Sequence, residues 1–178
     1  MNNTDLFEKT FNELSNSIQL FNKKQEEWSA IISLVKNNYD TDFSVLLKQN
    51  VVDMFNSIHE SKEKVLLASL LFLKSCEDIK NLHPEIVVSA NKIRNYSNFV
   101  VETKYSDMFI NYGLEANKLI EYLKSSESEQ HVDKLEHSLA VYQLWCDLIH
   151  KTNQITDYFD AISIELIKIS IITLKYGN

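Results

Sequence analysis

The chain has 178 residues, 44% of them hydrophobic, and 25 acidic and 18 basic side chains give a formal net charge of -7. This length and hydrophobic content suffice for one domain whose core needs neither disulfides nor metals. Two glycines and one proline leave few turn residues, which disfavours β-sandwiches, barrels and α/β folds. An acidic chain without a basic stripe is a poor nucleic-acid binder, so no nucleic-acid partner is predicted.

The first segment, about residues 5–38, carries apolar side chains at steps that alternate between four and three residues. A strand repeats every two residues and cannot produce this spacing, whereas a helix packed lengthwise on other helices does. Gln25 is the one interruption of the apolar series. The ladder reads Phe7, Phe11, Leu14, Ile18, Phe21, Gln25, Trp28, Ile32, Val35 and Tyr39.

The same alternation predicts a second helix over about residues 43–80 and a third over about 84–124. The second contains a stretch, residues 65–73, that is apolar on nearly all sides. Pro84 fits the first turn of the third helix and disfavours helix at the residue before it. Within the third helix, two successive steps of four residues predict a stutter in a continuous helix. These steps join Ser97, Val101 and Tyr105.

The fourth predicted helix, about residues 129–176, ends in a tail with two apolar stripes. One stripe contains Ile162, Leu166 and Ile169. The second contains Ile164, Ile167, Ile171 and Leu174. A surface helix of a monomer needs only one apolar stripe. We therefore expect the second stripe to be covered by another chain or by an apolar surface.

Four helices of similar length joined by short loops predict an all-α fold. The expected architecture is an elongated up-down-up-down four-helix bundle with coiled-coil-like heptad packing, in a single domain over residues 1–178. This topology brings the apolar stretches of the second and fourth helices to the same end, so one half of the bundle is more apolar. The predicted interface in that apolar half is Leu66, Leu70, Leu73, Ile164, Ile167, Ile171 and Leu174.

Several polar residues should share a height along this bundle, at about 1.5 Å per residue. A polar layer can fix helix register, although a small buried ligand site is an alternative use for it. Arg94 and Glu165 also fall at similar heights, which predicts a partly buried ion pair. The expected polar layer consists of Gln25, His59, Tyr105 and Asn153.

Motifs that would indicate an enzyme are incomplete. A di-metal bundle site needs two Glu-x-x-His motifs, and only Asp147 and His150 come close to one, so neither metal nor cofactor is predicted. Cys76 and Cys146 would lie too far apart for a disulfide and should be free thiols. No nucleophile elbow or phosphate-binding loop is present, and no catalytic residue is predicted.

The N-terminal residues lack the features of a conventional signal peptide, and no apolar run approaches 18 residues. We expect a cytoplasmic protein, with unconventional secretion left open. The predicted function is that of a non-enzymatic interaction protein that forms a homo-oligomer or binds another helical protein through its apolar half. One alternative is a surface-active bundle that binds a membrane or a lipid-like particle, as pore-formers and granule coats do. The other is a ligand-binding or metal-binding bundle enzyme.

Overall fold

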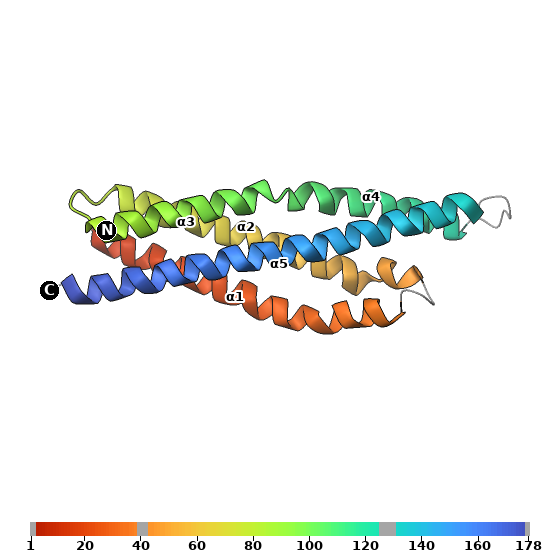
Figure 1. The fold of residues 1–178 in the computed structure, drawn as a ribbon, viewed down its shortest axis with the longest axis horizontal. Helices are drawn as coiled ribbons and strands as arrows, with labels where there is room; N and C mark the ends of the chain where they lie inside the picture. The colour runs from red at the N-terminus through yellow and green to blue at the C-terminus, as the bar shows by residue number, and fades with distance from the viewer. Residues whose placement is uncertain (1–2, 39–42, 125–130, 177–178) are drawn as a thin grey trace. The chain divides into compact units, whose positions relative to one another are not determined.

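The computed structural model describes residues 3–38, 43–124 and 131–176, and every regular element in these ranges is helical (Figure 1). The predicted all-α four-helix bundle is confirmed, with changes inside two of the four helices. Tyr39 and residues 129–130 of the prediction lie outside the described ranges. The helices are α1 (Asn3–Asn38), the 3-10 helix η1 (Phe43–Leu47), α2 (Gln49–Glu77), α3 (Pro84–Glu102), α4 (Tyr105–Lys124) and α5 (His131–Tyr176).

The second predicted helix is divided. It opens with the 3-10 turns of η1, and α2 follows from Gln49 to Glu77. Short 3-10 pieces are frequent where α-helices begin. α3 begins at Pro84. Proline has no backbone N–H, and this costs nothing in the first turn of a helix, where an N–H would have no partner within the helix. The ring Nδ1 of His83 accepts a hydrogen bond from the backbone N–H of Glu85 at 3.3 Å and caps this end.

The third predicted helix is two helices, and the prediction of a continuous helix with a stutter is wrong. α3 stops at Glu102, and Thr103 closes its last turn by donating its hydroxyl to the carbonyl of Val100 at 2.7 Å. Lys104 then takes the left-handed conformation, with φ at 54°. A left-handed residue cannot continue a right-handed helix, so the chain restarts as α4 at Tyr105. The break falls where the sequence shifts its apolar spacing.

The chain divides into two compact units. Unit 1 contains Met1–Lys24, Glu60–Thr103 and Gln154–Asn178, and unit 2 contains Gln25–His59 and Lys104–Asn153. α1, α2 and α5 each contribute a segment to both units, whereas α3 belongs to unit 1 and α4 to unit 2. Among the described residues each unit therefore has four α-helical segments, and unit 2 also contains η1.

Unit 1 is built from segments of α1, α2, α3 and α5 that contact one another in a closed ring. Aromatic rings, hydroxyls and charged groups all take part in these contacts. One contact of each neighbouring pair is Phe7–Phe72 for α1 and α2, Glu77–Arg94 for α2 and α3, Ser89–Glu165 for α3 and α5, and Phe21–Phe159 for α1 and α5. The fully buried core residues between them include Leu14, Ile18, Val65, Ile93, Val100, Ile162 and Ile169.

Unit 2 has an aromatic core. The Tyr112 ring of α4 lies 5.2 Å from the Phe55 ring of α2, and its hydroxyl donates to the carbonyl of Leu46 in η1. Burial raises the pKa of Tyr112, so the hydroxyl stays protonated and remains a donor. α1 and α5 add the buried indoles of Trp28 and Trp145.

Candidate interaction surface

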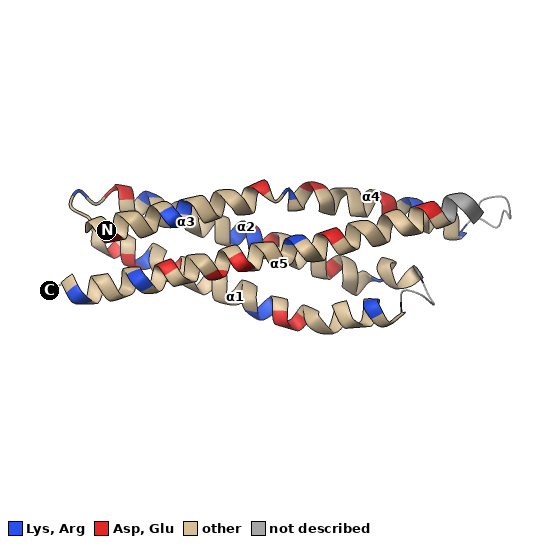
Figure 2. Ribbon diagram, viewed as in Figure 1, with Lys and Arg blue, Asp and Glu red and all other residues tan. Residues whose placement is uncertain are grey.

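The structure separates the two apolar stripes of the α5 tail. Ile162, Leu166 and Ile169 are buried in the core of unit 1. The other four apolar side chains stand on the outer face of the helix and are 54% to 81% exposed. We call this set, Ile164, Ile167, Ile171 and Leu174, the α5 stripe. Figure 2 shows acidic and basic positions scattered along the helices between longer stretches of other residues. In the sequence, Lys168 and Lys175 adjoin residues of the stripe.

A groove between α2 and α3 is the second apolar feature of unit 1. It has a volume of about 550 Å³ and is open to solvent. All three α2 residues of the predicted interface line it: Leu70 is exposed, Leu66 is half-buried, and Leu73 is buried and belongs to the floor. We call it the α2–α3 groove; its lining is Leu66, Leu70, Leu73, Lys74, Glu77, Arg94, Ser97, Asn98 and Val101.

Ser97 gives this groove a polar feature in its floor. The side chain is 8% exposed, and its hydroxyl has no hydrogen-bond partner among the described residues. A buried hydroxyl without a partner costs about 1–3 kcal/mol. The groove therefore offers an apolar wall and one unused hydrogen-bonding group.

Other exposed apolar side chains extend this surface over unit 1. On α2 and α3 they are Leu67, Leu71, Val87, Val88 and Phe99. The sequence predicted this concentration because residues 65–73 and 162–174 were expected at one end, and both fall in unit 1. Unit 2 also exposes apolar side chains, which among its described residues include Leu34, Ile110, Leu114, Leu123, Leu135 and Leu139.

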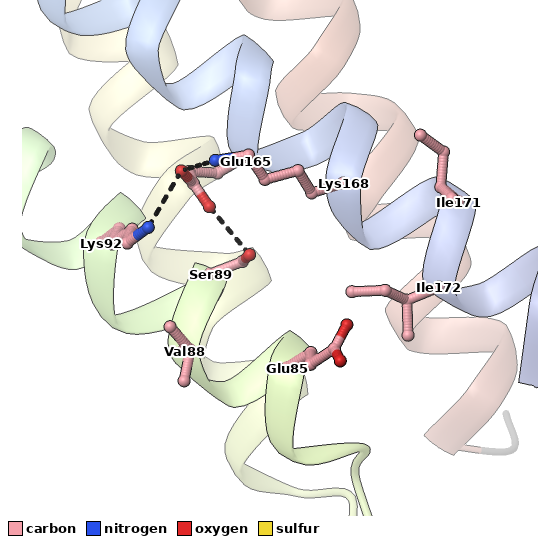
Figure 3. Close-up of a pocket in the computed structure, with 8 residues that line it drawn as sticks. All are labelled: Glu85, Val88, Ser89, Lys92, Glu165, Lys168, Ile171 and Ile172. Carbon is pink, nitrogen blue, oxygen red and sulfur yellow. Dashed lines mark hydrogen bonds and ion pairs between the residues drawn. The ribbon is translucent and has the colours of Figure 1, made fainter.

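A smaller pocket between α3 and α5, of about 360 Å³, holds a buried carboxylate (Figure 3). Glu165 is 3% exposed, and one of its oxygens accepts from the Ser89 hydroxyl at 2.8 Å. The other oxygen lies 2.6 Å from Nζ of Lys168 and 3.6 Å from Nζ of Lys92. Val88, Ile171 and Ile172 complete the apolar side of the pocket in Figure 3.

The pKa of Glu165 reflects two opposing influences. Burial disfavours the ionised form and acts to raise the pKa. The hydrogen bonds from Lys168 and Ser89, together with the charges of Lys168 and Lys92, outweigh burial and hold the pKa below its usual value. Glu165 is therefore an ionised and fully partnered group, which suits a structural role better than that of a general acid.

The predicted pair of Arg94 and Glu165 is wrong. Arg94 instead binds Glu77 of α2, with 2.5 Å between Nη2 and Oε1, and both side chains are largely exposed. The rise per residue fixes the height of a side chain along a bundle but not the direction in which it leaves the helix. Arg94 leaves α3 on the side of α2, whereas Ser89 and Lys92 leave it on the side of α5.

The predicted polar layer does not form as one buried set. All four residues belong to unit 2, where Tyr105 is buried, Gln25 and His59 are half-buried and Asn153 is exposed. Thr152, the sequence neighbour of Asn153, is buried instead, and its hydroxyl donates to the carbonyl of Leu148 at 2.8 Å.

Two members of the layer have specific contacts instead. The Tyr105 hydroxyl donates to the carbonyl of Phe55 at 3.4 Å, and burial raises the pKa of Tyr105, with a weaker opposing effect from its hydrogen bond with Thr152. His59 stacks on Phe109 and lies 3.4 Å from the Ser106 hydroxyl.

Few of the described side chains are suited to bind a metal ion or to act as a nucleophile. Within residues whose placement is described, no group of three or more His, Cys, Asp or Glu side chains could hold a metal ion. Cys76 and Cys146 are both free thiols, as the sequence predicts. Burial, reinforced by the charge of Glu77 and opposed by Arg94, raises the pKa of Cys76 to about 12, so its thiol is protonated and a poor nucleophile.

One cluster of unit 2 was missed in the sequence. Glu115 of α4 lies 2.6 Å from Lys118 and 2.7 Å from His137 of α5, and Tyr122 stacks on the same imidazole. The pKa of Glu115 is lowered, mainly by the hydrogen bond from Lys118. Burial acts to raise this pKa, and the hydrogen bond and charge of His137 act to lower it further. The spacing of Glu115 and Lys118 was readable in the sequence, but the partner on α5 was not.

Comparisons with known proteins give no relative for this chain. No protein-family model matches it, and neither a curated protein nor a solved structure does. No described helix is long and apolar enough to cross a membrane.

Proposed function

We propose that this chain is a non-enzymatic interaction protein that associates with itself or with another helical protein through the apolar surface of unit 1. The exposure of the α5 stripe carries the proposal. Fully burying an exposed aliphatic side chain is worth about 1.5–3 kcal/mol, and each of these four side chains still exposes more than half of its surface. Contiguous exposed apolar patches of this kind on a soluble domain usually mark contact sites.

The charged and nucleophilic side chains of unit 1 named above fit the same proposal. Glu165 and Arg94 are engaged in contacts within unit 1, and the buried Cys76 thiol is protonated. The proposal therefore assigns no catalytic residue and no cofactor. It assigns the energetic role to apolar side chains on α2, α3 and α5, with charged groups at the edges setting orientation.

The test is the mass of the full chain in solution, measured by light scattering over a range of protein concentrations. We expect wild-type protein to form oligomers without lipid. Ile167→Glu and Ile171→Glu should each shift the protein toward monomers while far-UV circular dichroism shows unchanged helicity, because both side chains point outward.

Leu139→Glu is the matched control, since Leu139 is an exposed apolar residue of α5 in unit 2. It should leave the oligomer intact. Addition of liposomes separates the lipid-binding alternative. A monomer that binds liposomes would replace the proposal with that alternative. A wild type that stays monomeric at high concentration and ignores liposomes would reject self-association through this surface.

A further inference from the structure

We propose that the α5 stripe packs against the α5 stripe of a second copy of this chain, with the two helices antiparallel about a two-fold axis. The inference rests on the proposed function and names its partner and its geometry. The stripe is one outward face of α5 from Ile164 to Leu174, which is about 15 Å at 1.5 Å per residue. Helices pack by fitting such ridges of side chains between one another.

Charges of opposite sign stand at the two ends of the stripe. Asp157 and Asp160 precede it, Lys175 follows it, and all three side chains are exposed. Asp160 accepts a hydrogen bond from the side-chain amide of Asn22 at 3.0 Å, and Nζ of Lys175 lies 5.1 Å from the centroid of the Tyr176 ring. Both of these partners are uncharged groups of the same chain. The outward face of α5 is therefore acidic before the stripe and basic after it.

These charges and the apolar side chains share one centre along α5. The midpoint between Asp160 and Lys175 falls directly after Ile167, and the midpoint between Ile164 and Ile171 falls at the same place. A two-fold axis there sets Asp160 of one copy opposite Lys175 of the other. It also sets Ile164 opposite Ile171 and brings the two copies of Ile167 together. One register therefore pairs both the charges and the apolar side chains.

The parallel direction has no such match. If the two-fold axis ran along the helices, each residue of α5 would face its own counterpart. Asp160 would then lie beside Asp160 and Lys175 beside Lys175, so that like charges would meet at both ends. A different protein would have to present the same charges in reverse order, whereas a second copy presents them by symmetry. The charge pattern therefore selects a second copy in the antiparallel direction.

The charges on the α3 side of the stripe neither favour nor oppose this arrangement. Four charged side chains line the pocket of Figure 3 there, namely Glu85, Lys92, Glu165 and Lys168, and their formal charges cancel. Lys168 lies close to the proposed axis, and its Nζ is 2.6 Å from a carboxylate oxygen of Glu165 in its own chain.

The charges on the α1 side follow the same symmetry with their signs exchanged. Glu8 lines a pocket with Leu174 near the basic end of the stripe, and Lys23 directly follows Asn22 at the acidic end. The two-fold axis turns α1 of one copy toward α1 of the other with its ends exchanged. Glu8 of one copy is thereby placed at the end where the other copy carries Lys23.

Reversal of one charge in the full-length chain tests the pairing. Asp160→Lys and Lys175→Glu each bring like charges together at both ends of the dimer. Each variant should therefore dimerise about 10- to 100-fold more weakly than the wild type in sedimentation velocity at low salt. In an equimolar mixture the two altered positions face each other, as do the two unaltered ones, so the mixture should dimerise as strongly as the wild type. Lys74→Glu, at an exposed position of α2 in unit 1, is the matched control and should leave the dimer unchanged.

Cysteine cross-linking tests the direction of the helices, in a chain that also carries Cys146→Ser. Ile167→Cys should give a disulfide-linked dimer, because its two copies meet at the axis. Leu174→Cys should not, because its two copies would lie about 20 Å apart along the helices. In a parallel dimer both variants would cross-link.

Three results would overturn the inference, and they differ in what they leave standing. If the charge reversals do not weaken the dimer, if the mixture is no stronger than either variant alone, or if Leu174→Cys cross-links, then the helices do not lie antiparallel about this axis. The proposed function then stands provided that Ile167→Glu still dissociates the dimer. A wild type that is monomeric at high concentration rejects a second copy and leaves another helical protein as the proposed partner. A dimer that survives Ile167→Glu rejects both the inference and self-association through the stripe.

Discussion

Glu165→Ala is expected to lower the free energy of unfolding by about 2–3 kcal/mol. Most of this comes from Ser89, which is 4% exposed and would lose the acceptor for its hydroxyl at a cost of about 1–3 kcal/mol. Lys92 and Lys168 are half-exposed and can return to water, so each lost ion pair adds only about 0–1 kcal/mol.

Glu165→Gln separates the hydrogen bond from the charge. The amide oxygen can still accept from Ser89, so the loss should fall to about 1 kcal/mol. The measurement is urea unfolding followed by far-UV circular dichroism. Asp157→Ala, on an exposed position of the same helix, is the control and should change stability by less than about 0.5 kcal/mol. If Glu165→Ala changes the free energy of unfolding no more than this control does, the hydrogen bond between Ser89 and Glu165 in Figure 3 does not stabilise the fold.

The ionised state of Glu165 also predicts how the free energy of unfolding depends on pH. The folded-state pKa of Glu165 is lowered, so at pH values below the ordinary glutamate pKa of about 4.3 the unfolded chain binds more protons than the folded protein. The stabilisation is therefore fully present above that pKa and is lost as the pH falls through the folded-state pKa. The stability difference between wild type and Glu165→Gln should be constant near neutral pH and shrink below about pH 4. A difference that grows on acidification would contradict the direction of the shift.

Three further changes test other parts of the fold. Lys104→Gly should raise the free energy of unfolding by about 0.5–1 kcal/mol in the same urea assay, because glycine accepts the left-handed backbone without strain; a loss of stability would argue against that conformation. Leu73→Ala should lower the free energy of unfolding by about 2–4 kcal/mol in thermal and urea unfolding, because Leu73 is buried. Leu70→Ala, at an exposed position, should lower it by less than about 0.5 kcal/mol. Equal losses would contradict the burial of Leu73 in the groove floor. Cys76 should react with a thiol reagent far more slowly than the half-buried Cys146 until the protein is unfolded, and mass spectrometry of modified peptides distinguishes the two.

The inward face of α1 could be predicted from periodicity, whereas in the first half of α5 the predicted seam positions Leu135 and Leu139 are exposed and Val141 and Trp145 are buried. Five positions of the α1 ladder are buried: Leu14, Ile18, Phe21, Trp28 and Val35. One face of a helix packs against its neighbours, and the spacing of the apolar residues identifies that face. The same reasoning identified the second α5 stripe, whose four side chains are exposed.

Features that depend on rotation or on local backbone choice could not be predicted. The assignment of Arg94 to Glu165 used height alone, and height does not say which neighbour a side chain faces. The steps of four at Ser97, Val101 and Tyr105 marked the right place for a change of phase. A locally unwound helix and a break both absorb such a change. The left-handed residue that decides between them, Lys104, has no sequence signature because it is not glycine.

The ring of contacts in unit 1 has a consequence for how the chain folds during synthesis. Asn22 of α1 bonds Asp160 of α5 at 3.0 Å across 138 residues, and Phe21 packs on Phe159 over the same separation. At about 5–20 residues per second, a ribosome needs about 7–30 s to supply that missing partner. For this interval α1 holds its apolar ladder without α5 to cover it. The newly made chain is therefore most exposed to aggregation before its last helix emerges, and chaperone demand should depend on α5 being complete.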